Sequence, residues 1–355
     1  MPSFKIGNRT VGDENPAYFI ADIAANHDGQ LARALKLIRL AKQAGAEAAK
    51  FQHFRAPKIV SDYGFRSLGR QISHQAKWSK SVYEVYKSAS LPWEWTKELK
   101  ECCDEEGIEF LSTPYDFDAV DMLDSYVPAF KIGSGDISWP EMLQCVAEKQ
   151  KPVILSTGAS DIQDVRRAVQ TVTSINPRLA LLQCNTNYTG SSVSFHHVHL
   201  NVLRAYQGFF PSVVIELSDH TPGHAAVLGA VALGGRIVEK HFTDDTSRVG
   251  PDHHFAMTPD SWREMVERTR ELEHALGSSE KRVADNEQET IVIQRRCLRA
   301  ARNLAAGTKL CRCDIEVLRP APCDAIFPYE MDKVIGRRVR FSMERGEQFT
   351  WLALE

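Results

Sequence analysis

Long apolar runs are missing from this sequence. No uncharged stretch is long enough to cross a bilayer, and the opening segment, MPSFKIGNRTVGDENP, has no apolar core of the kind found in a secretion signal. We therefore expect neither a membrane partner nor export from the cell.

Cysteine pairs of the CxxC kind are also missing, although the chain contains eight cysteines. Cys102 and Cys103 are adjacent, and Cys311 and Cys313 are separated by one residue. This spacing favours reduced thiols over a disulfide framework. A cytoplasmic location is the corresponding expectation.

A surplus of basic residues is absent as well. The chain has 43 Lys and Arg against 46 Asp and Glu, a formal net charge of -3, and no basic stripe. This balance excludes a dedicated nucleic-acid partner. With 355 residues, 43% of them hydrophobic, the chain can fill one large core and a small second domain.

Short β-branched or aromatic runs alternate with longer segments of helical period, and this alternation repeats eight times. Eight such units match the size of a (β/α)8 TIM barrel, which is typically about 250 residues. A doubly wound α/β sheet is the alternative. The predicted strands are 18–24, 48–54, 108–114, 129–134, 152–157, 179–184, 212–218 and 236–242.

Polar side chains gather where the predicted strands end. A barrel carries its chemistry at this face, because the loops that follow the strands meet there. The sequence therefore predicts an active site at the strand ends. The polar residues at these ends include Asp22, Lys50, Thr113, Lys131, Ser134, Ser156, Ser218, His220, Glu239 and His241.

Two histidines end the seventh and eighth predicted strands, which are neighbours in a closed barrel. The imidazoles of His220 and His241 could therefore converge on one point. Neutral imidazole is a common ligand for divalent metals, and a two-histidine site leaves coordination positions open for a substrate. The alternative is that each imidazole only hydrogen-bonds to a loop backbone.

Two lysines lie inside predicted strands among apolar residues, Lys50 in AAKFQHF and Lys131 in AFKIGSG. An unpaired ammonium group is costly there, so each lysine needs an anion. A clamp for phosphate or carboxylate, a structural Asp or Glu partner, and a Schiff-base amine of an aldolase all remain open.

Nine ordered motifs give the chain a family resemblance. They are IADIAANHDG (20–29), AGAEAAKFQ (44–52), FLSTPYD (110–116), FKIGSGD (130–136), ILSTG (154–158), LLQCNTNY (181–188), LSDHT (217–221), EKHFT (239–243) and GPDHHFAM (250–257). In this order they are similar to the sialic acid synthase family. Residues 295–355 resemble its small, β-rich antifreeze-like (SAF) domain. We expect a TIM-barrel domain over 1–278, a linker over 279–294 and the SAF domain over 295–355.

The resemblance implies an activity. The family condenses phosphoenolpyruvate with an open-chain acetamido or diacetamido sugar such as N-acetylmannosamine, giving a nonulosonic acid and phosphate. His220 and His241 resemble ligands of Mn2+ or Mg2+, and Asp22, Lys50 and Lys131 join them as catalytic candidates. Positions that resemble phosphoenolpyruvate contacts are Lys50, Thr113, Lys131, Ser134, Ser156 and Ser218. Further substrate-binding candidates are Tyr115, Asp136, Thr186, Tyr188 and Asp252.

The resemblance also implies a partner. Arg319, in LRPAP, resembles an arginine that the C-terminal domain of one protomer inserts into the active site of the other, so we expect a domain-swapped homodimer. Asp22 stands where the family usually has glutamate, Thr189 replaces a proline, and RPAP lacks the family's glycine. These departures leave the identity of the sugar open. A Schiff-base aldolase and a non-catalytic sugar-binding paralogue remain as alternatives.

Overall fold

A computed structural model describes residues 2–12 and 15–355 of the chain. The contacts between residues divide it into two compact units, one up to Gly277 and one from Ser278 to Glu355. Each unit has its own apolar core and is described by itself.

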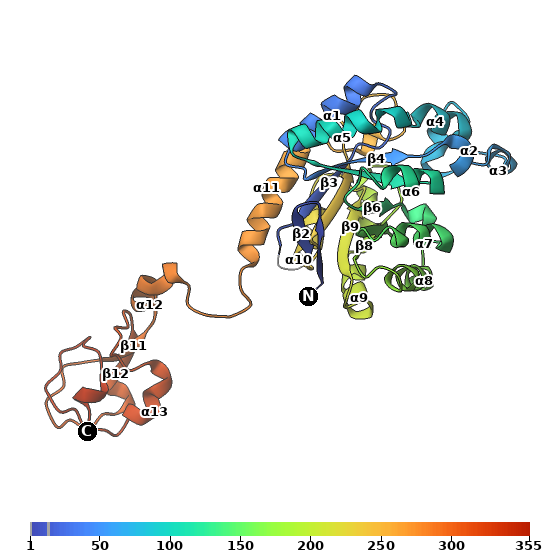
Figure 1. Ribbon diagram of the computed structural model, residues 1–355. Coiled ribbons are helices and arrows are strands. Elements are labelled where there is room, and N and C mark those ends of the chain that lie inside the picture. The colour runs from blue at the N-terminus through green and yellow to red at the C-terminus, as the bar shows by residue number, and fades with distance from the viewer. Residues whose placement is uncertain (1, 13–14) are drawn as a thin grey trace. The chain divides into compact units, whose positions relative to one another are not determined.

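The first unit is a closed barrel of parallel strands in the order β10-β3-β4-β5-β6-β7-β8-β9 (Figure 1). This arrangement confirms the predicted TIM barrel and excludes the open doubly wound sheet, because the last strand pairs with the first. The strands are β3 (Tyr18–Asp22), β4 (Ala48–His53), β5 (Glu109–Pro114), β6 (Phe130–Ile132), β7 (Val153–Ser156), β8 (Leu179–Cys184), β9 (Val214–Asp219) and β10 (Ile237–His241).

One main helix follows each strand and covers the outside of the barrel. These helices are α1 (Leu31–Gln43), α5 (Thr96–Glu106), α6 (Phe117–Leu123), α7 (Pro140–Glu148), α8 (Ile162–Thr173), α9 (Asn201–Phe209), α10 (Ala225–Ala232) and α11 (Pro259–Leu276). Between β4 and α5 the chain inserts three further helices, α2 (Ala56–Ile59), α3 (Asp62–Ser67) and α4 (Val82–Ala89). We call residues 56–89 the insertion.

Helix α8 shows how local sequence sets these elements. The Asp161 side chain accepts hydrogen bonds from the first free N–H groups of the helix and forms a capping box with Asp164. Apolar side chains then recur at helical spacing, and Val165, Ala168 and Val172 are buried against the barrel. The helix is therefore started by its cap and held by one apolar face.

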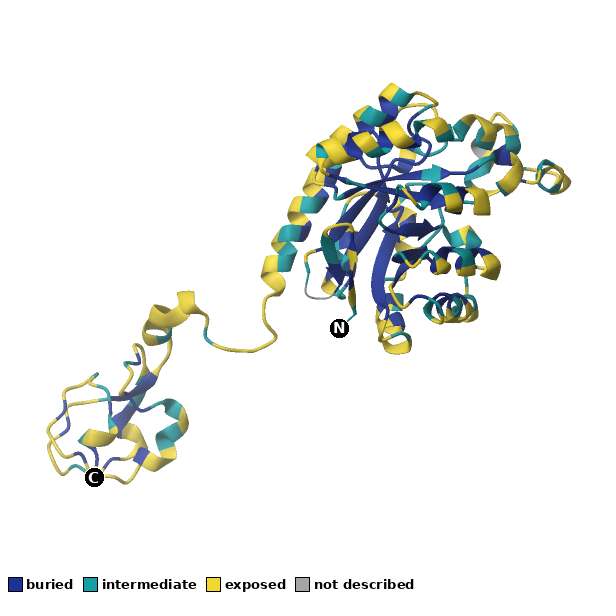
Figure 2. Ribbon diagram, in the orientation of Figure 1, coloured by how far each residue is buried: buried dark blue, intermediate teal, exposed yellow. Residues whose placement is uncertain are grey.

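The barrel strands are buried on both faces, and the outer surfaces of the helices are exposed (Figure 2). One apolar layer lies between strands and helices, and a second fills the inside of the barrel. An N-terminal hairpin, β1 (Ser3–Ile6) with β2 (Arg9–Gly12), contributes Phe4, Ile6 and Val11 to the inner layer. This hairpin closes the end of the barrel at which the strands begin.

The second unit is small. It contains α12 (Gln288–Gln294), the antiparallel pair β11 (Cys297–Ala300) and β12 (Ile315–Leu318), and α13 (Met331–Val334). Its core is built by side chains such as Leu298, Ile326 and Phe349. The segment predicted as a linker, 279–294, belongs to this unit and includes α12.

One cysteine expectation is wrong. Cys311 and Cys313 form a disulfide, whereas the sequence predicted reduced thiols throughout. A turn into β12 brings the two sulfurs together across a single intervening residue, which spacing in the sequence does not reveal. The other six cysteines are free. No helix in the described part of the chain has the length and apolar character needed to cross a membrane.

Candidate active site

His220 and His241 lie side by side at the barrel mouth. His241 is the last residue of β10, and His220 follows the end of β9, its hydrogen-bonded neighbour. The two ring centroids are 5.3 Å apart, and each residue is only 8% exposed. The structure thus brings together the pair that the sequence predicted.

Both imidazoles are set up as neutral ligands. Nδ1 of His220 lies 2.9 Å from the carbonyl oxygen of Asn185, which can only accept, so Nδ1 carries the proton and Nε2 is free. Nδ1 of His241 is buried without a hydrogen-bond partner. Burial, together with the other imidazole, lowers the pKa of His220 to about 4. Burial and Lys50 lower the pKa of His241 to about 3.

This donor set fits a divalent first-row metal, because two neutral imidazoles provide nitrogen ligands and leave further positions open. Among the described residues, a group of three possible ligands lies within reach of one ion only at Cys311, Cys313 and Asp314. The two sulfurs there are joined in a disulfide, and Asp314 is paired with Arg302. The histidine pair is therefore the better candidate metal centre.

Two lysines and two carboxylates lie at the base of the site. Nζ of Lys50 donates a 2.7 Å hydrogen bond to Asp22 and lies 3.9 Å from Glu239, while Nζ of Lys131 lies 3.3 Å from Glu239. Ser218 donates a 3.1 Å hydrogen bond to the same glutamate. Each lysine thus has a carboxylate partner, which the sequence analysis kept as an alternative.

The two lysines differ in protonation. Burial lowers the pKa of Lys50, but the charges of Asp22 and Glu239 outweigh this effect and raise it overall. For Lys131 burial dominates and lowers the pKa, despite Glu239. Glu239 itself stays ionised: burial raises its pKa, but Lys131 and Lys50 bring it down to about 2.

Hydroxyl and backbone donors lie on the neighbouring strands. Ser134 accepts a 2.9 Å hydrogen bond from the N–H of Gly158, and the buried hydroxyl of Ser156 has no partner. A Cβ on Gly158 would approach Thr186 Cγ2 to 2.3 Å and Ser134 Oγ to 2.9 Å, so a larger residue there would displace these two side chains. Thr113 Oγ1 lies 3.5 Å from Nζ of Lys50. This group of donors suits an anion such as phosphate.

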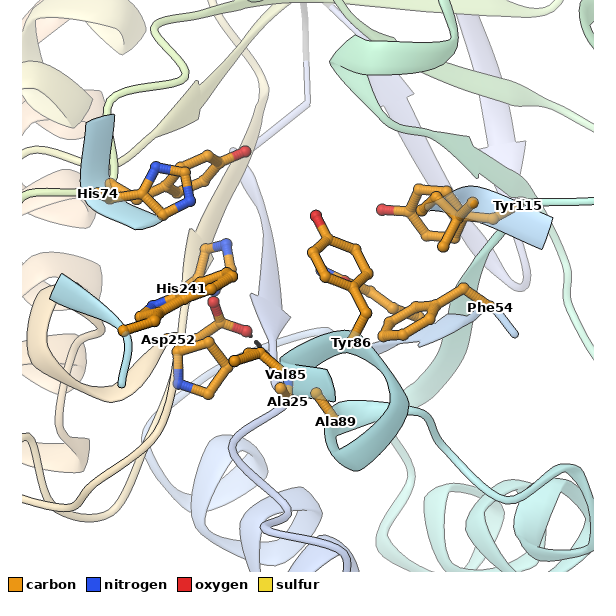
Figure 3. Close-up of a pocket in the computed structure, with 14 residues that line it drawn as sticks. Ala25, Phe54, His74, Val85, Tyr86, Ala89, Tyr115, His241 and Asp252 are labelled. Carbon is orange, nitrogen blue, oxygen red and sulfur yellow. Dashed lines mark hydrogen bonds between the residues drawn. The ribbon is translucent and has the colours of Figure 1, made fainter. Parts of the chain in front are cut away.

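A pocket of about 170 Å³ opens beside His241. Figure 3 shows His74, His241 and Asp252 on one side of it and Phe54, Tyr86 and Tyr115 on the other. Both walls combine residues that follow barrel strands with residues of the insertion: His74 of the insertion lies on the side of His241, and Tyr86 of the insertion lies on the side of Tyr115. Tyr188 packs edge-on against both His74 and His220.

Two carboxyl groups near the pocket have raised pKa values. Burial raises the pKa of Asp252 to about 6, although its Oδ2 accepts a 3.1 Å hydrogen bond from the N–H of Ala25. Burial also raises the pKa of Asp136 to about 6, and its Oδ2 is buried without a hydrogen-bond partner. Such groups are typical of sites that bind or transform a ligand.

The sequence analysis missed several residues of the site. Glu239 was noted as a strand end but not as a site residue, although it lies two residues before His241 and so faces the same side of β10. Phe255 packs against His241 and His220, with ring centroids 4.7 and 5.9 Å away. His74 lies in the insertion, whose position depends on tertiary contacts and has no local signal.

Arg319 is the predicted site residue that this unit does not contain. It is exposed and directly follows β12 in the second unit. Its side chain makes no hydrogen bond or ion pair with the part of the chain that the structure describes. Its role stays a prediction.

A closed α/β barrel with buried lysines, paired imidazoles and unpartnered polar atoms at its strand ends has the features of a barrel enzyme. The NeuB family model matches residues 37–281, and the SAF domain matches residues 295–355. The chain belongs to the NeuB family.

Relatives and solved structures agree with this assignment. The chain is 34% identical to an N,N'-diacetyllegionaminic acid synthase of Legionella pneumophila, over 98% of each chain. It is 30% identical to the human N-acetylneuraminate-9-phosphate synthase, over 96% of this chain and 93% of that one. The crystal structure of the Bacillus subtilis spore coat polysaccharide biosynthesis protein SpsE superposes with a TM-score of 0.65 at 31% identity and covers 99% of both chains.

Proposed function

We propose that the chain catalyses the condensation of phosphoenolpyruvate with an open-chain acetamido or diacetamido hexose, giving a nonulosonic acid and phosphate. The names of its relatives, synthases of N,N'-diacetyllegionaminic acid and N-acetylneuraminate 9-phosphate, support this class of product. They differ in the sugar that the product implies, so the hexose itself stays open between acetamido and diacetamido forms.

One observation carries the proposal: two buried ammonium groups and two neutral imidazoles meet at one end of the barrel. Lys50 and Lys131, with Ser134 and Ser156, can hold the phosphate and carboxylate of phosphoenolpyruvate by charge-assisted hydrogen bonds. His220 and His241 would hold a divalent ion, Mn2+ or Mg2+, which supplies Lewis-acid polarisation of an aldehyde oxygen and positive charge.

The pocket beside His241 is the place for the sugar. Asp252 and Tyr115 line it, and both present polar atoms that can hydrogen-bond to hydroxyl and acetamido groups. With the two substrates held in this way, C3 of phosphoenolpyruvate faces the aldehyde carbon of the sugar. Fixing this approach removes much of the entropic part of the barrier.

The bonds change as follows. The enol carbon C3 forms a bond to the aldehyde carbon, and the aldehyde oxygen takes up a proton. The Asp22–Lys50 pair can deliver it, since Oδ2 of Asp22 lies 3.6 Å from Nε2 of His241. Water adds to C2, the bond between C2 and the phosphate oxygen breaks, and a ketone remains. Of the two protons that the water releases, one balances the proton taken up by the aldehyde oxygen and the other leaves with the phosphate.

The decisive experiment measures phosphate released from phosphoenolpyruvate with a panel of acetamido and diacetamido hexoses, in chelator and after adding Mn2+. We expect release only with a sugar and a metal ion together. The same experiment tests the aldolase alternative. Burial lowers the pKa of Lys131, and a Schiff-base lysine needs a lowered pKa. Borohydride trapping of a lysine–sugar adduct in chelator would favour it, and sugar binding without phosphate release would favour a non-catalytic binder.

A further inference from the structure

Directly behind the two histidines lies a buried ionic cluster that the reaction does not use. Lys240 donates hydrogen bonds to the Asp219 carboxylate and, at 2.6 Å, to the carbonyl oxygen of Thr221. Asp219 in turn accepts hydrogen bonds of 2.9 Å from the N–H and from the hydroxyl of Thr221. We call Asp219, Lys240 and Thr221 the backing cluster. The side chains of the ion pair are almost fully buried, at 2% and 0% exposure.

The cluster lies on the helix-facing side of the barrel wall. Side chains alternate between the two faces along a strand. Ser218, which precedes Asp219, and Glu239, which precedes Lys240, face the site, and Ser218 donates a hydrogen bond to Glu239. Lys240 and Asp219 are register partners in the pairing of β10 with β9, so they meet on the opposite face. No substrate atom in the barrel mouth can reach them from that side.

Fold stability alone does not account for this pair. A buried ion pair contributes little or nothing to stability compared with apolar side chains of the same volume, because desolvation offsets the attraction. What such a pair does supply is fixed geometry. Here it fixes all the polar atoms of Thr221, since its N–H, hydroxyl and carbonyl oxygen are all bound.

The sequence positions show what this geometry controls. His220 lies between Asp219 and Thr221, so the backbone is held on both sides of it. His241 directly follows Lys240. The residues that carry the two imidazoles are thus each adjacent in sequence to a member of the backing cluster, while their ring centroids lie 5.3 Å apart.

We propose that the backing cluster is a positioning device for His220 and His241. It sets the placement of the two imidazoles relative to each other, and the affinity of the site for a divalent metal follows from that placement. The statement about metal affinity rests on the proposed function, but the statement about the imidazoles does not.

The test uses the full-length chain and two readouts that need no turnover. The first is 15N NMR of histidine-labelled protein. The protonated Nδ1 of His220, which donates a hydrogen bond to the carbonyl oxygen of Asn185, gives a defined signal. The second is Mn2+ affinity without substrates. The variants are Lys240→Met, Thr221→Val and the double variant Asp219→Leu/Lys240→Met, which removes both charges and so leaves no unpaired ion.

A matched control is Arg270→Met. Arg270 bonds to the carbonyl oxygen of Ala17, just before β3, and pairs with Glu47 and Glu273, so its loss affects the end of the barrel where the strands begin. We expect the control to lower the unfolding temperature but to leave the His220 signal and the Mn2+ affinity unchanged. The backing-cluster variants should shift or broaden the His220 signal and weaken Mn2+ binding about 10- to 100-fold.

An unchanged His220 signal and unchanged Mn2+ affinity in the folded double variant would overturn the proposal and leave the cluster a structural role only. If the wild-type protein binds no Mn2+, the metal part of the proposed function fails. The NMR readout then decides alone: an altered His220 signal supports positioning, and an unaltered one refutes it.

Discussion

Asp22 and Lys50 form a buried ion pair in the barrel wall, with Oδ2 and Nζ 2.7 Å apart and each side chain at most 3% exposed. They are register partners on β3 and β4. The aspartate stands where the family that the sequence resembles usually has glutamate. The aspartate side chain is one methylene shorter than a glutamate side chain, and it still reaches the lysine of the adjacent strand.

Asp22→Asn should destabilise the protein. Asparagine keeps the shape of the side chain but leaves the Lys50 ammonium group with only Glu239, 3.9 Å away. Removing one partner of a buried pair costs about 3–5 kcal/mol, and we expect the lower end of this range. Urea unfolding measures the loss. The double variant Asp22→Asn/Lys50→Met should recover part of it, and strictly additive losses would show that the two side chains are not coupled.

Lys131→Met should weaken the binding of phosphoenolpyruvate and leave the binding of the sugar unchanged. The change removes one charge-assisted contact of about 1.5–3 kcal/mol, which raises the KM for phosphoenolpyruvate about 10- to 100-fold. Steady-state kinetics with each substrate varied in turn measures both constants. Lys149→Met is the control, because Lys149 pairs with Asp121 near the surface, away from the site. An equal loss for both substrates would mean that Lys131 has a structural role.

Asp136→Asn should raise stability at neutral pH and lower activity. The pKa of Asp136 is raised to about 6 in the folded chain, from a usual value of 3.8. Its contribution to stability is thus fully present below about pH 4 and is lost as the pH rises through 6. At pH 7.5 the variant should be more stable by about 1–3 kcal/mol, and the gain should vanish near pH 4. Thermal unfolding at both pH values tests this, and a higher KM for the sugar should accompany it.

His220→Ala and His241→Ala should each abolish condensation while the chain stays folded. Each removes one of the two proposed nitrogen ligands, and neither side chain belongs to the apolar core. Phosphate release with added Mn2+ and circular dichroism are the measurements. His196→Ala, at an exposed position, is the control. Full activity of either site variant in chelator would rule out the metal assignment.

Arg319 should act in the active site of a second copy of the chain. It is exposed and has no side-chain partner among the described residues of its own chain, as expected for a residue that completes another site. Mixing inactive Arg319→Ala with inactive His241→Ala should restore part of the activity, because a hybrid dimer has one site with both intact halves. If activity stays absent after verified subunit exchange, Arg319 serves its own barrel or no active site.

The barrel could be predicted from the sequence because strands buried on both faces leave short apolar runs, as in Leu179–Cys184. Each run is followed by a segment of helical period. Side chains two residues apart on a strand face the same side, so the position of His241 could have identified Glu239 as a site residue.

The rest of the site depends on contacts that no local pattern encodes. His74 reaches the pocket because the insertion folds over the barrel mouth and packs against Tyr188. The lysine partners were undecided in the sequence, because Asp22 and Glu239 lie on different strands from Lys50 and Lys131. The disulfide of Cys311 and Cys313 likewise depends on how a turn folds.

The N-terminal hairpin has a consequence for biosynthesis. Its residues Phe4, Ile6 and Val11 belong to the same inner apolar layer as Ile237 of β10, which is synthesised more than two hundred residues later. The apolar layer that the hairpin joins is therefore incomplete until the last strand has emerged. Before β10 is synthesised, these apolar side chains lack part of their native packing, and shielding by a chaperone would matter most during that interval.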